Sequence, residues 1–241
     1  MIASYYIRSL IFNITSVLFT TILYCCCLPV LLLKNKKPAK QVTVIWVKAL
    51  LFLARVICGI RLKINGEHLI PNDKRFILAS KHSSVWETLF FQGYFNAACY
   101  ILKKELFSIP ILGWFAKAVG MIGIDRSKGA SALKLISQKV KTVETLPVII
   151  FPQGTRVLYD KDYSTQKYPY KQGVYVVSKI SGMKVLAATH NAHKYWGRGY
   201  FSLKKAGVIE VTFCDFCQEL KTIDDFNALV NNIEKNTLNL L

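Results

Sequence analysis

Residues 9–33 carry no charged side chain, and this uncharged segment constrains the fold more than any other feature of the chain. A helix of this length can cross a bilayer core of about 30 Å. A cleaved secretory signal is the competing interpretation, but only Arg8 precedes the segment, and a lysine-rich stretch, residues 34–40, follows it in place of a small-residue cleavage site. The pattern therefore favours a retained membrane helix, which Pro29 is expected to kink or end.

The lysines of residues 34–40 also predict the orientation of the chain. Four of them follow the apolar segment whereas Arg8 alone precedes it, so the positive-inside rule places the rest of the chain on the cytoplasmic side. We therefore expect the protein at the cytoplasmic (inner) membrane, with its globular part facing the cytoplasm.

A second apolar segment, residues 42–60, is interrupted by Lys48 and Arg55. Their seven-residue spacing puts both charges on one helical face, which favours an amphipathic helix in the membrane interface over a second span. A buried core helix is an equally good interpretation of this pattern. We expect residues 1–60 to form an N-terminal membrane-anchoring helical region and residues 61–241 to form the globular domain.

The charge distribution indicates that anionic membrane lipids are a partner. The chain is 52% hydrophobic with a net charge of +18, and half of that charge lies before Glu67, the first acidic residue. Each basic side chain near an anionic leaflet contributes about 1 kcal/mol to attachment, and the same charge attracts anionic substrates. Nucleic acid is the alternative partner for so basic a chain, but the neighbouring apolar segments disfavour it.

Short β-branched runs alternate with longer amphipathic runs from Arg61 onward, which predicts an α/β fold with a sheet flanked by helices. The expected strands are residues 75–80, 97–102, 121–125, 148–151, 184–189 and 208–213, and the clearest helices are residues 130–145 and 224–240. Polar clusters follow five of these strands, where ligand sites gather in open α/β sheets. These clusters are His82, Lys103 with Lys104, Asp125 with Arg126, residues 153–156, and Thr189 with His190 and Asn191.

His82 and Glu87 are the candidate catalytic pair. An imidazole titrates near neutral pH and can accept a proton from an alcohol, and a nearby carboxylate can fix its tautomer. Ser84 and Glu87 also have the spacing of a helix capping box, in which Glu87 contacts a backbone N–H instead. Since no Ser or Cys stands in an elbow-type motif, a hydroxyl of the substrate itself is the expected attacking group.

The seven cysteines are expected to be reduced thiols, because the globular part is predicted to face the cytoplasm. Cys214 and Cys217, together with His190 and His193, have the residue types of a zinc site. A strand-like run leads straight into the two cysteines, however, without the turn residues of a zinc knuckle. We therefore expect no metal at these residues.

Four motifs, in their order and spacing, make residues 60–195 closely resemble the glycerolipid acyltransferases, most of all the bacterial membrane 1-acyl-sn-glycerol-3-phosphate acyltransferases. The motifs are His82 to Glu87 (His-x-x-x-x-Asp in the family), Gly120 to Arg126 (ending in Ile-Asp-Arg), Phe151 to Arg156 (Phe-Pro-Glu-Gly-Thr-Arg) and, more loosely, Val185 to Thr189 (an apolar strand with Pro). The resemblance implies an acyltransferase-type mixed sheet flanked by helices, preceded by N-terminal membrane helices.

The resemblance also implies an activity. His82 would take the proton of the sn-2 hydroxyl of lysophosphatidic acid, with Glu87 as its partner, and that hydroxyl would attack the thioester of acyl-CoA or acyl-carrier protein to give phosphatidic acid. Neither a metal nor a tightly bound cofactor is implied. Guanidinium groups match phosphate oxygens, so the two arginines of the motifs would hold the acceptor's phosphate. The implied substrate-binding residues are Arg126, Gln153, Gly154, Thr155 and Arg156.

Three residues depart from the motifs of the family. Glu87 stands in place of Asp, Gln153 in place of Glu, and Ala187 in place of Pro. Glu87 lengthens the carboxylate arm by one methylene, and Gln153 removes a negative charge beside the proposed phosphate loop. Two alternatives therefore stay open: an acyltransferase for a different lyso-lipid acceptor, or a membrane-bound lipid-binding homologue without turnover.

Overall fold

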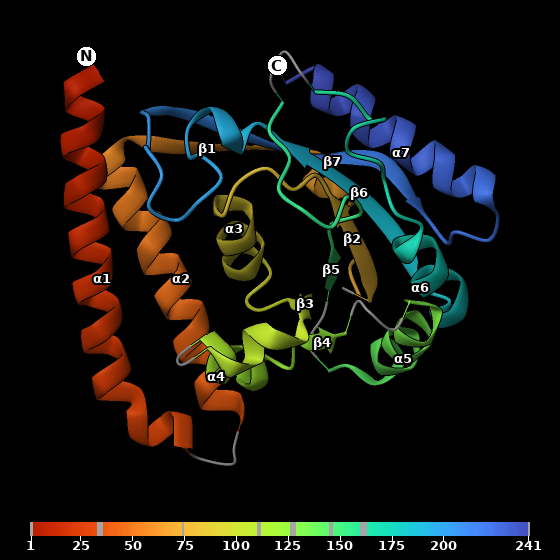
Figure 1. Cartoon of the computed structure of the whole chain (residues 1–241), viewed down its shortest axis with the longest axis horizontal. Coiled ribbons are helices and arrows are strands. Elements are labelled where there is room, and N and C mark those ends of the chain that lie inside the picture. The colour runs from red at the N-terminus through yellow and green to blue at the C-terminus, as the bar shows by residue number, and fades with distance from the viewer. Residues whose placement is uncertain are drawn as a thin grey trace.

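The first two helices, α1 (Ile2–Leu32) and α2 (Lys36–Cys58), form an antiparallel hairpin along one side of the computed structural model (Figure 1). The structure describes residues 2–32, 36–73, 75–109, 112–125, 129–144, 147–159 and 163–240. α1 contains most of the uncharged segment, but it begins earlier, at Ile2, and continues past Pro29. Both helices are long and apolar enough to cross a membrane.

The hairpin exposes apolar side chains on its outer surface. In α1 these are Ile2, Tyr6, Ile7, Leu10, Ile11, Ile14, Val17, Leu18 and Ile22. In α2, Leu50 and Ala54 are buried, whereas Phe52 and Val56 are exposed. α2 is therefore a core helix on one face and an apolar surface helix on the other, so both interpretations of its sequence pattern describe part of it. An exposed apolar surface of this kind is typical of membrane association.

The described residues of the globular part form a seven-stranded mixed sheet. Its strands are β1 (Ile60–Asn65), β2 (Phe76–Ser80), β3 (Cys99–Lys103), β4 (Ile122–Ile124), β5 (Val148–Ile150), β6 (Lys184–His190) and β7 (Gly207–Gln218). Their order across the sheet is β1-β7-β6-β2-β5-β3-β4, and every pairing is parallel except that of β6 with β7. Parallel neighbours require crossover connections, which place helices over the faces of the sheet.

Helices cover both faces of this sheet (Figure 1). They are α3 (Trp86–Tyr94), α4 (Leu112–Val119), α5 (Gly129–Thr142), α6 (Gly173–Ser181) and α7 (Ile223–Leu238), with short 3₁₀ turns η1 (Glu67–Leu69), η2 (Lys104–Ser108) and η4 (Ala192–Lys194). α2 packs against α3 on one side, and α5 packs against α6 on the other, where α7 also lies against β6 and β7.

β2 shows how the sequence produces these two layers. Side chains alternate between the faces of a strand, and Phe76 and Leu78 belong to the core beneath α2 and α3, while Ile77 and Ala79 belong to the core beneath α5, α6 and α7. All four are fully buried. A strand covered on both faces has a continuous apolar sequence, and its carboxyl end is where His82 follows.

The sequence predicts six strands, and the structure contains all six, as β2 to β7. The two predicted helices correspond to α5 and α7. β7 extends to Gln218, beyond the predicted end at residue 213. β1 was not predicted. It is an edge strand in which Arg61, Leu62 and Lys63 are exposed, so its sequence lacks a clear alternation of apolar and polar residues. The domain boundary between residues 60 and 61 stays a prediction.

A buried lysine ties α1 to the loop that follows η4. Lys204 Nζ donates to Asn13 Oδ1 at 2.9 Å, to the carbonyl oxygen of Tyr200 at 2.8 Å and to that of Ser202 at 3.0 Å. The ammonium also lies over the rings of Phe12, Trp196 and Tyr200. These contacts satisfy all three ammonium hydrogens, so a charge that is fully buried is tolerated without a carboxylate.

We expect Lys204→Ala to lower the free energy of unfolding by about 2 to 4 kcal/mol, because it leaves buried acceptors unpaired and opens a cavity beneath α1. Denaturant unfolding in detergent measures this loss. Lys205→Ala, which changes the exposed neighbouring lysine, serves as the control and should have almost no effect. Equal stability of the two variants would show that this contact does not hold α1.

Candidate active site

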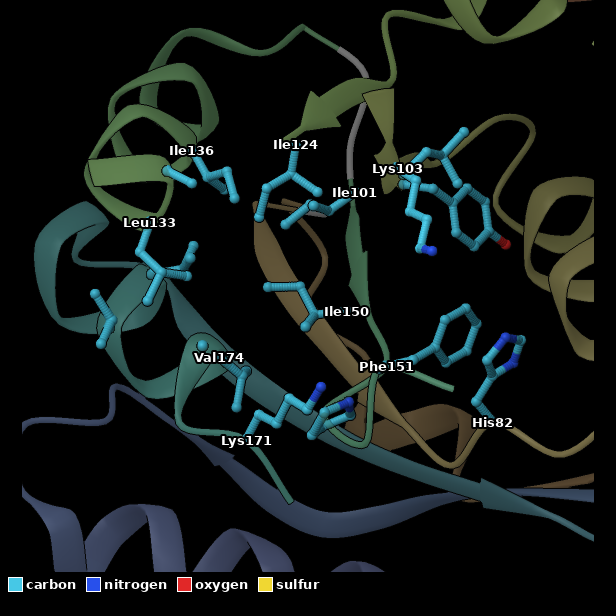
Figure 2. Close-up of a pocket in the computed structure, with 18 of the residues that line it drawn as sticks. His82, Ile101, Lys103, Ile124, Leu133, Ile136, Ile150, Phe151, Lys171 and Val174 are labelled. Carbon is cyan, nitrogen blue, oxygen red and sulfur yellow. The ribbon is translucent and has the colours of Figure 1, made fainter. Parts of the chain in front are cut away.

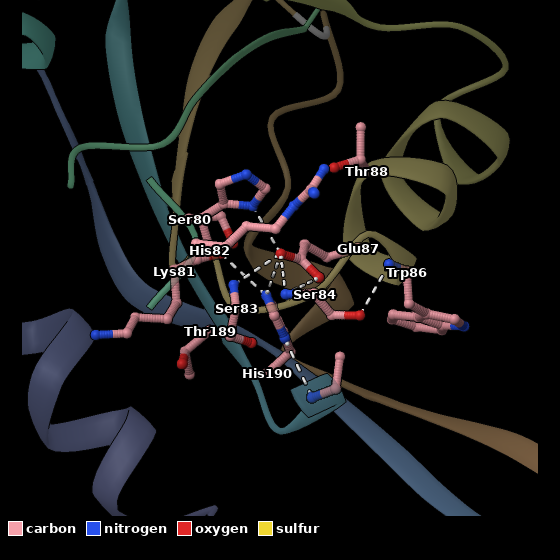
Figure 3. A network of polar contacts seen from close by, with 12 residues as sticks. Ser80, Lys81, His82, Ser83, Ser84, Trp86, Glu87, Thr88, Thr189 and His190 are labelled. Atoms are coloured by element: carbon pink, nitrogen blue, oxygen red, sulfur yellow. Dashed lines mark hydrogen bonds and ion pairs between the residues drawn. The ribbon is translucent and has the colours of Figure 1, made fainter. Parts of the chain in front are cut away.

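His82 and Glu87 contact each other directly. His82 lies in the loop after β2, and Glu87 lies in the first turn of α3, which brings His82 Nδ1 to 2.8 Å from Glu87 Oε1 (Figure 3). The Glu87 carboxylate is fully buried and also accepts the backbone N–H groups of Ser83 at 2.8 Å and Ser84 at 2.9 Å. The two interpretations of Glu87 are therefore compatible. Its carboxylate contacts the imidazole of His82 and also accepts the backbone N–H of Ser84, which is one of the two hydrogen bonds of a capping box.

The charge of Glu87 is stabilised by these donors. Burial alone raises the pKa of its carboxyl, but the nearby imidazoles of His190 and His82 and the backbone N–H of Ser84 outweigh burial and hold the pKa below its usual value. Glu87 is therefore ionised at neutral pH. An ionised carboxylate can only accept hydrogen bonds.

This assignment fixes the tautomer of His82. Because Glu87 is an acceptor, Nδ1 of His82 carries a hydrogen, and in the neutral tautomer the lone pair is then on Nε2. The imidazole stacks on the ring of Phe151, with 3.9 Å between the ring centroids, and its side chain is 14% exposed. The ring is thus held in one orientation while one edge stays open to a ligand.

His190, at the end of β6, lies next to the Glu87 carboxylate. Its Nε2 lies 3.8 Å from Glu87 Oε1 and donates to the carbonyl oxygen of Lys81 at 2.9 Å, while its Nδ1 accepts the N–H of Ala192 at 3.3 Å. Burial lowers the pKa of His190 more than the neighbouring Glu87 raises it, so the ring is neutral at neutral pH. The sequence predicted a polar cluster after this strand, but it did not predict that His190 would reach Glu87.

An apolar cavity of about 640 Å³ opens beside His82 (Figure 2). His82 and Phe151 stand at one end of it, and branched aliphatic side chains of the sheet and of α5 and α6 line the other end. These aliphatic residues include Ile101, Ile124, Leu133, Ile136, Ile150 and Val174. A volume in this range suits a ligand of drug or lipid size, and the lining suits an acyl chain.

Among the described residues, the cationic side chains of Arg156, Lys103 and Lys171 line the same cavity. Arg156 Nη1 donates to the carbonyl oxygen of Arg198 at 3.2 Å, while its Nε is buried and has no hydrogen-bond partner among the described residues. Burial lowers the pKa of Arg156. Glu87 opposes this shift, and Arg198 adds to it. A guanidinium nevertheless stays charged at neutral pH. Arg156 therefore brings a positive charge to the cavity that His82 also lines.

The other predicted substrate-binding residues lie in different surroundings. Gly154 lines the cavity in a turn with φ of 68°, a left-handed conformation that favours glycine. Thr155 is exposed and accepts a hydrogen bond from Arg198 Nη2 at 3.3 Å. Gln153 is buried, and its amide donates to the carbonyl oxygen of Tyr168 at 2.9 Å rather than lining the cavity. Arg126 lies outside the described residues.

Two of the four residues weighed as zinc ligands, His190 and Cys214, have other hydrogen-bond partners. Both ring nitrogens of His190 are engaged, and the Cys214 thiol donates to the carbonyl oxygen of Thr212. Across the described ranges, no group of three or more His, Cys, Asp or Glu residues has the arrangement of a metal site.

Comparisons with known proteins agree with the motifs. The family model described as "Acyltransferase" matches residues 61–194. The 1-acyl-sn-glycerol-3-phosphate acyltransferase of Pseudomonas aeruginosa is 35% identical over 170 residues, which are 69% of this chain and 63% of that protein. This chain therefore matches less than two thirds of the length of the Pseudomonas relative. The 1-acyl-sn-glycerol-3-phosphate acyltransferase alpha of Mus musculus is 23% identical over 202 residues, which are 80% of this chain and 68% of that protein.

A solved structure shows the same fold. The crystal structure of the 1-acyl-sn-glycerophosphate (LPA) acyltransferase PlsC from Thermotoga maritima matches with a TM-score of 0.73 at 18% sequence identity, and the match covers 97% of each chain. The similarity extends over almost the whole chain and so includes the helical hairpin as well as the mixed sheet.

The pKa of His193 predicts a loss of stability in acid. Burial, and then the neighbouring His190 and Lys194, lower the pKa of His193 to about 4. In the unfolded chain a histidine has a pKa of about 6.5, so as pH falls below that value the unfolded state takes up the proton first. Stability that is present above pH 6.5 is therefore lost progressively as pH falls toward 4.

We expect His193→Asn to reduce the difference in unfolding free energy between pH 7.5 and pH 5 by about 1 kcal/mol, after allowance for the partial exposure of His193 to solvent. Denaturant unfolding at the two pH values measures the difference. His68→Asn, at an exposed histidine, is the control and should leave the pH dependence unchanged. An equal change in unfolding free energy between the two pH values in both variants would contradict the prediction.

Proposed function

The chain belongs to the acyltransferase family, and on that premise we propose that it transfers an acyl chain from acyl-CoA or acyl-carrier protein to the sn-2 hydroxyl of 1-acyl-glycerol-3-phosphate. The product is phosphatidic acid. The observation that carries the proposal is the 2.8 Å contact between His82 Nδ1 and Glu87 Oε1, at a histidine that lines an apolar cavity together with cationic side chains. The names of the Pseudomonas and mouse relatives support the same acceptor.

The reaction follows from the geometry of the pair. His82 Nε2 takes the proton of the sn-2 hydroxyl as its oxygen bonds to the thioester carbonyl carbon, and the imidazolium that forms is stabilised by the Glu87 carboxylate. The tetrahedral intermediate then collapses, the carbon–sulfur bond breaks, and the thiolate receives the proton from His82. Every step is a proton transfer or a displacement, so the proposed reaction uses no metal and no tightly bound cofactor.

The acceptor's phosphate would bind at the cationic side chains of the cavity. Arg156 brings a guanidinium whose Nε has no described partner, and Lys103 adds a second positive charge to the lining. Gly154 leaves room for the phosphate to approach the backbone. The roles of Arg126, Gln153 and Thr155 stay predictions, in which Arg126 is a second phosphate ligand and Gln153 and Thr155 complete the loop.

The apolar part of the cavity would hold an acyl chain while the thioester lies beside His82. Each methylene that moves from water into such a lining contributes about 0.8 kcal/mol. Ile101, Ile150 and Val174 bring this lining from the sheet and from α6 toward the base. A cavity whose lining is mostly apolar but includes cationic side chains matches a substrate with one tail and one anionic head.

The hairpin would hold the enzyme at its substrate. The exposed apolar residues of α1 and α2 would enter the bilayer, and the basic residues of the first 66 positions would bind anionic headgroups. We propose the cytoplasmic side of the inner membrane as the location, on the basis of the lysines that follow α1. Lysophosphatidic acid resides in the membrane, so attachment brings the acceptor near the site.

We expect His82→Ala to abolish formation of phosphatidic acid, with a loss of about 10²- to 10⁴-fold in turnover. Glu87→Gln should cause a comparable loss, because its amide can donate to Nδ1 and force the hydrogen onto Nε2. Purified protein with lysophosphatidic acid and acyl-CoA, analysed by mass spectrometry, measures both. Membrane attachment should be unchanged. Full turnover in His82→Ala would refute the role of His82 as the general base.

The second candidate function is lipid binding without turnover, which the replacement of the family's Asp and Glu by Glu87 and Gln153 suggested. The 2.8 Å contact between Glu87 and His82 favours catalysis, since the longer carboxylate reaches the imidazole. The same assay separates the two functions. Lysophosphatidic acid bound by the wild-type protein without any product, from either acyl-CoA or acyl-carrier protein, would support the binding protein.

Arg156→Ala should raise the KM for lysophosphatidic acid by about 10-fold or more, because a charge-assisted hydrogen bond to phosphate is lost. The KM for the acyl donor should change little. Steady-state kinetics with each substrate varied in turn measure both constants. Arg61→Ala, at an exposed arginine of β1, is the control. An equal rise in both KM values would contradict the phosphate role.

A further inference from the structure

Lys81, the residue before His82, is fully buried and points away from the catalytic ring toward α7 (Figure 3). Its Nζ donates to Tyr163 Oη at 3.0 Å and to Glu234 Oε1 at 3.3 Å. Burial lowers the pKa of Lys81 to about 8, and Glu234 opposes this shift. The ammonium also lies over the rings of Tyr159 and Tyr163, at 4.0 and 4.3 Å from their centroids.

Three tyrosine hydroxyls converge on the same carboxylate. Tyr163 donates to Glu234 Oε1 at 2.7 Å, Tyr170 donates to the same oxygen, and Tyr159 donates to Oε2. Glu234 thus accepts four donors, including Lys81, although its side chain is only 16% exposed. We call Lys81, Tyr159, Tyr163, Tyr170 and Glu234 the Glu234 cluster. Burial of so many polar groups is tolerated because each has a partner.

The tyrosines of the cluster belong to the segment that carries Arg156. Its described residues are 152–159 and 163–171, and the N–H of Lys171 closes its base by donating to the carbonyl oxygen of Pro152 at 2.9 Å. Gly154 and Arg156 lie near its start, and Lys171 at its end lines the cavity as well. Loop segments of this kind depend on their own side chains for a fixed shape. Here the side chains that fix it are attached to α7.

The cluster is also connected to the catalytic pair through the backbone of Lys81. The N–H of Lys81 donates to the carbonyl oxygen of Ala188 in β6 at 3.2 Å, and its own carbonyl oxygen accepts from His190 Nε2. The carbonyl oxygen of His82, the next residue, accepts the N–H of Val157 at 2.7 Å. One carboxylate on α7 therefore contacts both the residue before the base and the loop that bears the guanidinium.

We propose that Glu234 is a positioning residue for the acceptor's phosphate, acting through the tyrosines and Lys81 to hold Arg156 at a fixed distance from His82. This inference rests on the proposed function, since it assumes that Arg156 binds a phosphate group. Glu234 touches neither substrate nor base. Its effect reaches the reaction because a displacement of about 1 Å in a substrate-binding group can cost as much as 100-fold in rate.

Charge balance explains why a carboxylate occupies this position. Lys81 brings a positive charge into the interior, and Glu234 is the described carboxylate within ion-pair distance of it. With a glutamine at position 234, the tyrosine hydroxyls compete for one acceptor oxygen and Lys81 loses its counter-charge. The loop would then relax toward another arrangement, and Arg156 would move with it.

The test compares Glu234→Gln and Tyr170→Phe with the wild-type protein. Binding of 1-oleoyl-glycerol-3-phosphate is measured by calorimetry without an acyl donor, and binding of 1-oleoyl-glycerol, which lacks the phosphate, is measured in parallel. We expect the Kd for the phosphate-bearing lipid to rise about tenfold in Glu234→Gln, the effect of weakening one charge-assisted hydrogen bond. The Kd for 1-oleoyl-glycerol should not change.

Tyr170→Phe keeps the ion pair and removes a single hydroxyl, so it covers the case in which Glu234→Gln fails to fold. We expect it to weaken binding of the phosphate-bearing lipid about threefold. Tyr175→Phe is the matched control, because Tyr175 lies in α6 and donates to the carbonyl oxygen of Lys221 outside the cluster. The double variant Lys81→Met/Glu234→Gln removes the unpaired charge and should recover part of the affinity.

Kinetics supply a readout that a merely structural role would not move. A positioning role raises the KM for the acceptor and leaves the KM for the donor unchanged. A structural role lowers the amount of active protein and leaves both KM values unchanged, and that result would overturn the inference. Unchanged binding of 1-oleoyl-glycerol-3-phosphate in Tyr170→Phe and in folded Glu234→Gln would overturn it as well.

The calorimetric binding measurement tests this inference independently of the proposed function. A wild-type protein without turnover would contradict the acyltransfer reaction. Weaker phosphate-dependent binding in the two cluster variants would still support the positioning role of Glu234 in that case.

Discussion

The buried carboxylate of Glu87 is the interaction on which the arrangement of the site depends. It accepts hydrogen bonds from the imidazole of His82 and from two backbone N–H groups before α3, so one side chain both caps the start of a helix and orients the imidazole. The carboxylate is ionised although no solvent reaches it, because its oxygens are surrounded by donors. The orientation of the His82 ring is therefore a property of the junction between β2 and α3, and it follows from how the chain turns at that point.

Two lysines, Lys81 and Lys204, are fully buried and hold opposite ends of the chain to the sheet. Lys204 binds Asn13 of α1, and Lys81 binds Glu234 of α7. In both cases the ammonium lies over aromatic rings, which offset part of the loss of hydration. An apolar residue could fill either space, but it would not select one arrangement of its neighbours as strictly as a charge with directional partners does.

The sequence predicted the contact between His82 and Glu87 and the positions of six strands because the relevant patterns are local. A spacing of five residues across a strand end sufficed for the contact between His82 and Glu87, and the apolar run of residues 76–79 identified a strand buried on both faces. His190 was not assigned to the pair, since its place beside Glu87 depends on the register of β6 against β2. The orientation of Gln153 and the role of Glu234 likewise depend on contacts between distant segments, which no local pattern encodes.

The attachment of α1 has a consequence for biogenesis. The hydroxyl of Ser9 and the backbone of Lys204 bond to each other across 195 positions of sequence, so the helix leaves the ribosome long before its docking partner exists. At ordinary translation speeds this delay is roughly 10 to 40 s. We propose that α1 is inserted in the bilayer during that time. The side chains of Ser9 and Asn13 then lack their hydrogen bonds to Lys204 until residue 204 has been synthesised. Maturation then ends at the membrane surface, when the newly synthesised sheet closes onto a helix that was delivered first.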